Sequence, residues 1–510
     1  MSNHHLHAGH VTTLVSSLAL IASLSFPAHA TPSPTNELPT TPSSTRTTPS
    51  PTGVRLMHRD MNSSDALPWA GPGNNPSVTF SIPFGACSTA FQTSTKMTIA
   101  LCTKYVGLRH GITPIAPTVV LMDPHTARPL ATWELRKNGL LGGVYGYLDK
   151  QDRVVMTEGN KLLKIAFRAV EQPSATRQWE FYVDESTTIP GLPETVSIAG
   201  VIPDEAGNTW FSTSDALVGS ITPAGKVRTL QLGNGERVAN GLTPRPNGVS
   251  VLTTHKLWEI SGPVPKVKWV RPYDRGRARK AGQLSWGSGT TPTFFGPNHS
   301  RVAIVDSADF TPRLLVFDAE TGRTICTMPA FRAPNQGTEN SIMAHGNSLW
   351  IPSTYGFTYP KLAVEGPQFP EKATFLGGLT RIDLVNDRCV RRWENMHRIS
   401  TLPMLTLKDF RIWSLTTDLD STRVWVVSVD ARTGRETSRT PVGWLPFDEP
   451  MQLTGMITPD GVMWQGTATR MLRIAPPVAS SSSHTRLPRK NLAGQHHRVY
   501  LSAHPLDAPT

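Results

Sequence analysis

Two acidic residues lie three positions apart at the end of a predicted β-strand. Asp306 and Asp309 follow the apolar run Val302–Val305. A pair of carboxylates at this spacing can bind a cation, or can act as acid and base in proton transfer. Aspartate in this position also commonly caps its own turn through its side chain, and we favour that role here.

Glu339 and Asn340 open a further predicted strand, directly after Thr338. Glu339 is a candidate catalytic residue and, together with Asn340, a candidate metal ligand. The alternative is a surface hairpin whose polar side chains are solvated. Among the polar groups of the sequence, we rank this pair highest as a functional site.

Two histidines near predicted strand ends, His255 and His345, are further catalytic candidates. An imidazole titrates near neutral pH, so either could abstract a proton or assist in opening a lactone. A lone histidine is more often structural, and this is the alternative at both positions.

The Gly-rich stretch Gly287–Thr291 has the composition of a phosphate loop, but it lacks the P-loop lysine and no helical pattern follows. We interpret it as a tight loop whose Ser288 and Thr290 contact a ligand or cofactor. Three aromatic residues could offer a stacking surface for a sugar, although core packing is the commoner role: Tyr145, Trp286 and Tyr355.

No complete catalytic motif accompanies these residues. The sequence has no Gly-x-Ser-x-Gly elbow between a strand and a helix, and no His-Glu-x-x-His motif. These absences argue against a serine hydrolase of the α/β type and against a zincin metalloprotease.

The elements that must position these residues are predicted to be strands. Charged residues make up only 17% of the chain, and 44 Pro and 40 Gly require frequent turns. No long segment of the body has the apolar spacing of an amphipathic helix.

The net charge of +12 is scattered along the chain. The densest basic run, from Arg271 to Lys280, lacks the interleaved aromatic residues that bind single-stranded nucleic acid. We therefore interpret this run as a solvated loop and expect no nucleic-acid partner.

Residues 1–30 have the pattern of a signal peptide. An apolar run from Val11 to Phe26 precedes Ala28-His29-Ala30, a small-x-small cleavage site, although the start carries histidines in place of Lys or Arg. A retained anchor is the alternative, but the run is shorter than the roughly 20 residues of a span. We expect a secreted or cell-envelope protein with no stable membrane span, and a monomer.

An oxidising compartment would allow the four cysteines to pair. Three pairings are open to them. Cys87 and Cys102 flank a hairpin-like segment, which favours pairing them with each other and Cys326 with Cys389.

Composition divides the remaining chain into three parts. Residues 31–75 are rich in Thr, Pro and Ser and are predicted to form a disordered linker, and residues 477–510 a disordered tail. The folded body is therefore expected over residues 76–476.

This body repeats one turn, Asp-x-x-Thr-(Gly/Ala)-Arg, at Asp123–Arg128, Asp318–Arg323 and Asp430–Arg435, each after a β-rich run. Strand units recur about every 40–50 residues, which is typical of propeller blades. We predict an all-β fold, a single β-propeller of eight blades with seven as the alternative count. Blades begin near residues 95, 143, 196, 238, 291, 340, 403 and 452. Val78–Ile82 should close the ring by joining the last blade. Two β-sandwiches are the competing fold.

Several of these motifs resemble known families. The repeated turns are similar to those of quinoprotein-like propellers. The unit Thr458–Trp464, with its Pro-Asp-Gly turn, resembles the gluconolactonase, senescence-marker and strictosidine-synthase-like group. The stretches Gly287–Thr293, Val305–Asp309 and Thr338–Ser341 look like a block found in uncharacterised secreted bacterial propellers.

The lactonase-like resemblance implies one axial divalent cation, Ca²⁺ or another, held by Asn240, Asp306, Asp309, Glu339 and Asn340. That family's early glutamate has no clear counterpart here. The quinoprotein-like resemblance does not extend to a quinone cofactor, because Trp133 follows its turn at a different spacing and Ala127 replaces the turn glycine.

Two functions follow from these observations. The first is a secreted ligand-binding or interaction propeller of the cell envelope, with a small-molecule or glycan ligand. The second is an extracytoplasmic, metal-dependent hydrolase or lyase of the lactonase-like type, with Glu339, His255 and His345 as its catalytic candidates.

Overall fold

A computed structural model describes residues 53–83, 85–106, 113–136, 145–171, 178–239, 241–334 and 336–477. The predicted signal peptide, most of the predicted tail and Asn240 lie outside these residues. Strands dominate the described chain, which has no α-helix and two 3-10 turns, η1 (Pro297–His299) and η2 (Lys361–Ala363). None of its helices is long and apolar enough to cross a membrane.

The strands form eight antiparallel sheets, the blades, that follow one another along the chain. Blade 1 contains β3 (Gly85–Gln92), β4 (Thr98–Val106), β5 (Thr113–Met122) and β6 (Pro129–Glu134). Blade 2 contains β7 (Tyr147–Leu148), β8 (Val154–Glu158), β9 (Lys161–Val170) and β10 (Gln178–Thr188). Blade 3 contains β11 (Ile198–Pro203), β12 (Thr209–Thr213), β13 (Leu217–Ile221) and β14 (Val227–Gln231). Blade 4 contains β15 (Leu242–Arg245), β16 (Gly248–Leu252), β17 (Lys256–Ser261) and β18 (Lys266–Pro272).

The second half of the chain repeats this plan. Blade 5 contains β19 (Thr293–Phe295), β20 (Arg301–Val305), β21 (Arg313–Asp318) and β22 (Thr324–Pro329). Blade 6 contains β23 (Met343–His345), β24 (Ser348–Pro352), β25 (Leu379–Val385) and β26 (Arg388–Asn395). Blade 7 contains β27 (Met404–Thr406), β28 (Arg411–Thr417), β29 (Arg423–Asp430) and β30 (Glu436–Trp444), with β1 (Ala66–Leu67) added in parallel to β27. Blade 8 contains β31 (Gly455–Ile457), β32 (Met463–Gly466), β33 (Met471–Ala475) and β2 (Ser77–Ser81).

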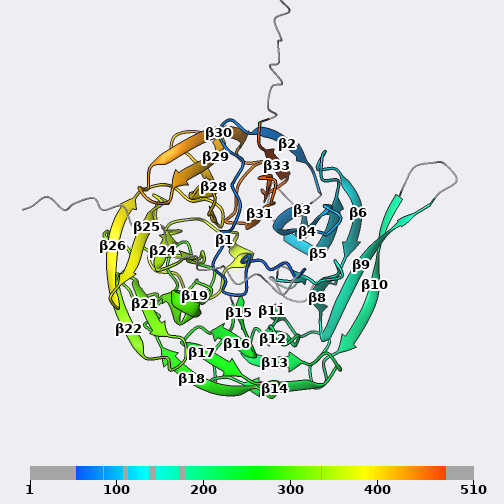
Figure 1. Cartoon of the computed structure of the whole chain (residues 1–510), viewed down its shortest axis with the longest axis horizontal. Coiled ribbons are helices and arrows are strands. Elements are labelled where there is room, and N and C mark those ends of the chain that lie inside the picture. Colours follow the sequence, from blue (N-terminus) through cyan, green and yellow to red (C-terminus); the bar gives the residue numbers. More distant parts are fainter. Residues whose placement is uncertain are drawn as a thin grey trace, which may run out of the picture. The chain divides into compact units, whose positions relative to one another are not determined.

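The ring closes through β2, which comes from the start of the chain and pairs with β33 near its end. This confirms the predicted closing strand. Figure 1 shows the fourth strands β6, β10, β14, β18, β22, β26, β30 and β2 on the outside of one circle. The all-β propeller of eight blades is therefore confirmed, and the sandwich alternative is wrong.

Seven of the predicted blade starts lie within a few residues of a first strand, but blade 1 begins at Gly85 and not near residue 95. The missed strand β3 has the sequence GACSTAFQ, whose small residues give a weak strand signal.

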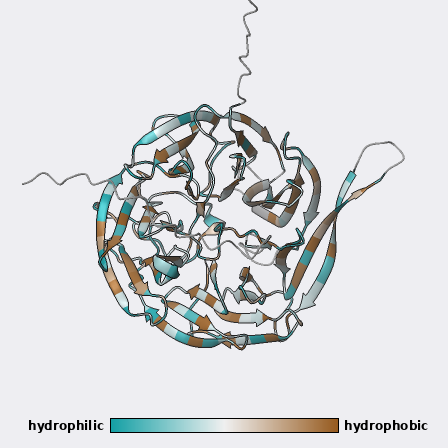
Figure 2. Cartoon of the chain, in the orientation of Figure 1, coloured by the Kyte–Doolittle hydropathy of each residue, from teal (hydrophilic) through white to brown (hydrophobic). Residues whose placement is uncertain are grey.

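Hydrophobic clusters join each blade to its neighbours. One cluster links blades 1 and 2, for example, and another links blades 8 and 1, where Trp464 packs near the Cys87–Cys102 disulfide. Burying a large side chain of this kind contributes about 1.5–3 kcal/mol. Figure 2 shows apolar and polar residues mixed along the outer strands, and in β30 half-buried and exposed residues alternate over residues 436–441.

Both predicted disulfides are confirmed. Cys87 and Cys102 face each other within blade 1, and Cys326 of β22 joins Cys389 of β26. The second bond ties the outermost strands of blades 5 and 6 together.

The three repeated turns occupy equivalent positions, between the third and fourth strands of blades 1, 5 and 7. In each, one aspartate oxygen accepts two backbone N–H groups and the threonine hydroxyl, as at Asp318. Gly322 then takes a positive φ of 69°, and the ring of Trp269, from the outer strand of the preceding blade, lies against it. The turn thus fixes the docking of one blade on the next.

Antiparallel strands give the ring two faces. The connections between second and third strands, and those between successive blades, lie on one side of the ring, which we call the long-loop face. The remaining turns leave the other side, the short-turn face. The longest connections, residues 273–292 and 353–378, are both on the long-loop face. They bind each other, for instance where Gly356 N–H donates to Ala281 O.

Candidate functional site

The middle of the ring is occupied by the chain's own residues 53–70, which we call the axial segment (Figure 1, where β1 lies near the centre). The segment binds inner strands of five blades: Arg55 to Leu148, Ser63 to Thr243, Asn62 to Phe294, Ser64 to Ala344, and Asp65 to Leu405. Leu56, Met61 and Leu67 are buried.

The predicted linker boundary at residue 75 therefore differs from the structure, which places residues 53–75 against the ring. The reason is local composition. Thr, Pro and Ser dominate up to residue 52, whereas the stretch from Val54 to Trp69 carries apolar residues that can be buried.

A hydrogen-bonded network fixes the axial segment at its centre. His58 Nδ1 lies 3.0 Å from Asp65 Oδ2, and His58 Nε2 lies 3.2 Å from the hydroxyl of Thr291, in the connection between blades 4 and 5. All three side chains are buried. The arrangement resembles an acid–histidine–hydroxyl relay, in which the carboxylate orients the imidazole.

Asp60 caps the tight turn between His58 and Asp65. Its carboxylate accepts the N–H groups of Asn62 and Ser64 and the hydroxyl of Ser64. Burial nevertheless raises the pKa of Asp60 to about 6, because the desolvation cost exceeds the effect of these bonds.

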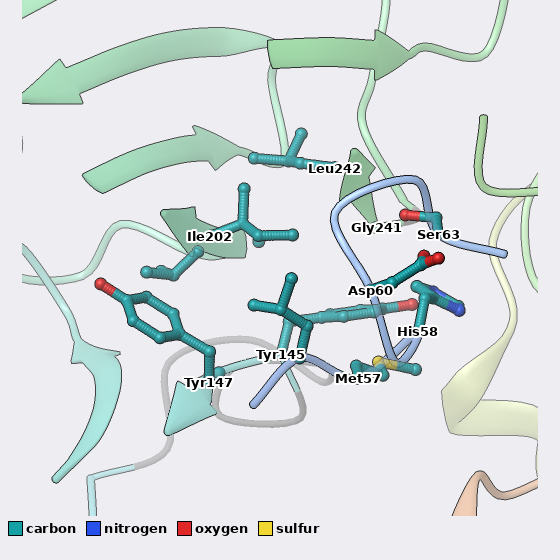
Figure 3. A pocket seen from close by; sticks show the side chains of 13 residues that line it. Met57, His58, Asp60, Ser63, Tyr145, Tyr147, Ile202, Gly241 and Leu242 are labelled. Carbon is teal, nitrogen blue, oxygen red and sulfur yellow. The ribbon is translucent and has the colours of Figure 1, made fainter. Parts of the chain in front are cut away.

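A small cavity lies beside this turn, between the axial segment and blades 2, 3 and 4. Its volume of about 20 Å³ has room for about one water molecule. Figure 3 shows Tyr145, Asp60 and His58 at one end of the cavity and Tyr147, Ile202 and Leu242 at the other. The cavity is too small for a substrate of ordinary size.

Glu339 lies close to this network on the long-loop face. Ser341, two residues further on, has its hydroxyl 3.4 Å from His58 Nδ1. Part of the Glu339 side chain reaches solvent, but both carboxylate oxygens are sealed from it and have no hydrogen-bond partner of good geometry among the described residues. Such a group costs free energy unless something pairs with it.

The surroundings of Glu339 are specific. Only a glycine fits at position 289, where a Cβ would lie 2.4 Å from Glu339 Oε2. Burial raises the pKa of Glu339 well above its usual range, and the Leu284 backbone and the Arg279 guanidinium offset this only in part. The carboxyl group therefore keeps its proton to a higher pH than an ordinary glutamate does.

Two partly buried tyrosines complete this region, Tyr145 and Tyr359. Burial raises the pKa of each hydroxyl, and the charge of Glu339 raises both further. We call Tyr145, Arg279, Glu339 and Tyr359 the axial cluster. The cluster combines two aromatic rings, a guanidinium that donates to Gln283 O, and a carboxyl group.

The other predicted site residues have polar groups that already bond to the protein itself. Asn340 donates from its amide to Gln452 Oε1 at 2.7 Å, toward the connection between blades 7 and 8. The Ser288 hydroxyl donates to Val305 O, and the Thr290 hydroxyl accepts the Val305 N–H. These residues hold the loops in place.

Neighbouring side chains hold both histidine candidates in place. His255 is on the long-loop face, where one ring nitrogen faces the Thr254 hydroxyl and the other accepts from Arg275. His345 is on the short-turn face, where its ring packs edge-on against Phe410. Burial lowers the pKa of both imidazoles, so they stay neutral near pH 7.

Asp306 caps its own turn by accepting the N–H groups of Ala308 and Arg313, the role favoured from the sequence. Asp309 accepts the Arg277 N–H. Within the described ranges, no three His, Cys, Asp or Glu side chains gather in a way that could hold a metal ion. Asp306, Asp309 and Asn340, named for the axial cation, therefore bond to separate partners, and Asn240 lies outside the described residues.

Two corrections concern what the sequence interpretation missed. Arg279 and Lys280 belong to the run interpreted as a solvated loop, yet both are buried, and Lys280 donates to Asp309 O. His58 and Asp65 lie inside the segment predicted to be a linker, so the sequence interpretation assigns them no role. The change in composition after residue 52 was the available signal.

Seven four-stranded sheets and one five-stranded sheet, arranged in a ring, define this chain as an eight-bladed β-propeller. Among solved structures it is similar to BamB from Moraxella catarrhalis, with 12% identity, a TM-score of 0.36, and coverage of 64% of this chain and 94% of that one. It is also similar to virginiamycin B lyase from Staphylococcus aureus, with 10% identity, a TM-score of 0.39, and coverage of 79% and 99%. A third is the quinohemoprotein alcohol dehydrogenase from Comamonas testosteroni, with 9% identity, a TM-score of 0.39, and coverage of 88% and 83%.

All three are β-propellers. No family model and no curated protein matches the sequence. At these levels of identity the likeness concerns the fold alone, and the grouping with gluconolactonase-like propellers stays a prediction.

Proposed function

We propose that this chain is an extracytoplasmic ligand-binding propeller, and that the axial cluster holds a small, neutral, hydroxyl-bearing ligand such as a saccharide. The observation that carries the proposal is the carboxyl group of Glu339, which is sealed from solvent near Tyr145 and Tyr359 and lacks a hydrogen-bond partner of good geometry among the described residues. A sugar hydroxyl would supply the missing hydrogen bonds.

The chemistry of the cluster suits a neutral ligand better than a charged one. A protonated carboxyl group donates one hydrogen bond and accepts others, which matches a hydroxyl group in both directions. The rings of Tyr145 and Tyr359 match the apolar face of a sugar. Export remains part of the proposal. It is supported by two disulfides, which persist in oxidising compartments, and by the signal-peptide pattern of residues 1–30.

Ligand binding can be tested on the mature protein with a panel of saccharides, polyols and amines, using thermal shift followed by calorimetry. Glu339→Ala should abolish binding of the ligand found. Glu339→Gln should retain it within about tenfold, because an amide still donates and accepts. Glu320→Ala, at an exposed glutamate on the short-turn face, is the matched control.

The outcomes separate the ligand classes. Loss of binding in both Glu339 variants would show that the ligand is a cation that needs the negative charge. Full binding by Glu339→Ala, or no stabilisation of the wild type by any compound of the panel, would contradict the proposal.

A further inference from the structure

Residues 356–375 form a compact loop on the long-loop face, within the connection between β24 and β25, and we call them the Ω-loop. The two ends of this loop touch, because a Cβ at Gly356 would collide with the carbonyl group of Thr374. Gly356 takes a positive φ of 85°, which permits the sharp turn at the base of the loop. Compact surface loops whose ends meet are frequently functional.

The Ω-loop is packed by its own aromatic side chains. The ring of Phe357 meets those of Tyr359 and Phe375 edge-on, with ring centres 4.8 Å and 5.5 Å apart. Phe357 and Phe375 are buried, whereas most of residues 365–374 are exposed. A loop with a small core of its own and an exposed outer half can open at a lower free energy than the ring of blades unfolds.

Main-chain hydrogen bonds join the outer half of the Ω-loop to the connection between blades 4 and 5. Arg279 donates its N–H to Pro367 O at 2.9 Å, and Arg279 O accepts from the Phe369 N–H at 2.9 Å. The Glu365 N–H donates to Leu284 O at 2.8 Å. The Ω-loop therefore holds Arg279 and Leu284 in place through their backbones.

The same two residues reach Glu339. Burial raises the pKa of Glu339, and the Leu284 backbone and the Arg279 guanidinium lower it in part. Tyr359, which the Ω-loop itself carries, also lies near this carboxyl group: burial raises the pKa of the Tyr359 hydroxyl, and the charge of Glu339 raises it further. Displacing the Ω-loop would therefore move Tyr359 away and release Arg279 and Leu284 together.

One exposed ion pair fastens the outer half of the Ω-loop to the ring. Arg237, in the connection between blades 3 and 4, donates two hydrogen bonds of 3.0 Å to the carboxylate of Glu365. The two side chains are 47% and 55% exposed. Because water competes for both partners, a pair of this kind is weak and can break and re-form readily.

We infer that the Ω-loop is a lid that controls access to the Glu339 carboxyl group, and that the Arg237–Glu365 ion pair is its latch. The inference rests on the proposed function in one respect, because the ligand of that site would have to pass the lid. In the closed form both carboxylate oxygens of Glu339 are sealed from solvent. A ligand that bonds to them draws on the open form, so its apparent affinity depends on how often the lid opens.

Chemical labelling of Glu339 tests the lid without any ligand. The mature protein is treated in mildly acidic buffer with a water-soluble carbodiimide and glycinamide, which convert accessible carboxyl groups to amides, and peptide mass spectrometry locates the product. The wild type should label Glu339 much more slowly than the exposed Glu320. Arg237→Gln and Glu365→Gln should each raise the rate at Glu339 about two- to fivefold, the factor by which an exposed ion pair biases an equilibrium.

Two controls separate opening of the lid from general loosening of the protein. Glu180→Gln breaks a comparable exposed pair, with Arg168 of blade 2, and should leave the rate at Glu339 unchanged. The buried carboxylate of Asp448, which pairs with Arg470, reports on opening of the ring and should label equally slowly in every variant.

The double variant of the latch should label Glu339 no faster than either single one, since both changes remove the same pair. Three results would overturn the inference: equal rates at Glu339 in the latch and control variants, acceleration at Asp448 in parallel with Glu339, or a wild type that labels Glu339 as fast as Glu320. Because the labelling needs no saccharide, a ligand panel without a hit contradicts the proposed function and not the lid.

Discussion

His58 and Asp65 form a buried pair in the centre of the ring, with 3.0 Å between Nδ1 and Oδ2. The pair belongs to the axial segment, yet it lies among residues of blades 4 to 7. It connects the start of the folded chain to the inner strands that come much later. Its contribution to stability is therefore a direct measure of how far the axial segment holds the ring together.

His58→Ala or Asp65→Asn should lower the free energy of unfolding by about 3 kcal/mol, because removing one partner leaves the other buried without its hydrogen bond. Urea unfolding measures this, and limited proteolysis within residues 53–75 should become faster. His125→Ala, at an exposed histidine, is the control and should unfold as the wild type does. Equal unfolding curves for all variants would show that the axial segment is not coupled to the ring.

The repeated turns allow a matched test of blade docking. Gly322→Ala would place a Cβ 2.7 Å from the Trp269 ring at a φ of +69°. Gly225→Ala has a similar φ of +74° in the corresponding turn of blade 3, but nothing lies within 4 Å of the new Cβ. Both variants bear the backbone strain of about 1 kcal/mol, and only Gly322→Ala adds a clash worth about 1–3 kcal/mol. Thermal unfolding should separate them, and identical losses would refute the role of Trp269.

The Cys326–Cys389 disulfide should raise the free energy of unfolding by holding two blades together, because it joins blades 5 and 6 across a sequence separation of 63 residues. Replacing both cysteines by serine should cost about 2–4 kcal/mol. Chemical unfolding with and without reductant measures the effect. A double-serine variant that unfolds like the oxidised wild type would contradict it.

Asp306 should give the protein an unusual pH dependence. Burial raises its pKa to about 7, above the ordinary value near 4 of the unfolded chain. The folded state then holds one more proton between these values, so this contribution to stability is present at low pH and is lost as pH rises through about 7. Measured between pH 4 and pH 7, the stability difference between wild type and Asp306→Asn should change by about 1.4 kcal/mol per pH unit. A difference that does not vary with pH would show that Asp306 keeps an ordinary pKa.

The sequence by itself determined the architecture and its covalent links. A turn such as Asp318–Arg323 forms hydrogen bonds within itself, and a strand such as Val302–Val305 has its own apolar pattern. Both can therefore be predicted from the local sequence alone. The spacing of these local signals gave the number of blades, and the short apolar stretch at residue 78 gave the closure. The disulfide pairing followed once Cys87 and Cys102 were placed across a hairpin.

Only the tertiary structure decided the centre. Whether the Glu339 carboxyl group is paired depends on Gly289, Arg279 and Tyr145, which come from other blades or other loops. The burial of Lys280 in a basic run and the entry of His58 into the ring depend likewise on distant segments. Burial and pairing are properties of groups brought together from far apart in the chain, and local composition does not record which groups those are.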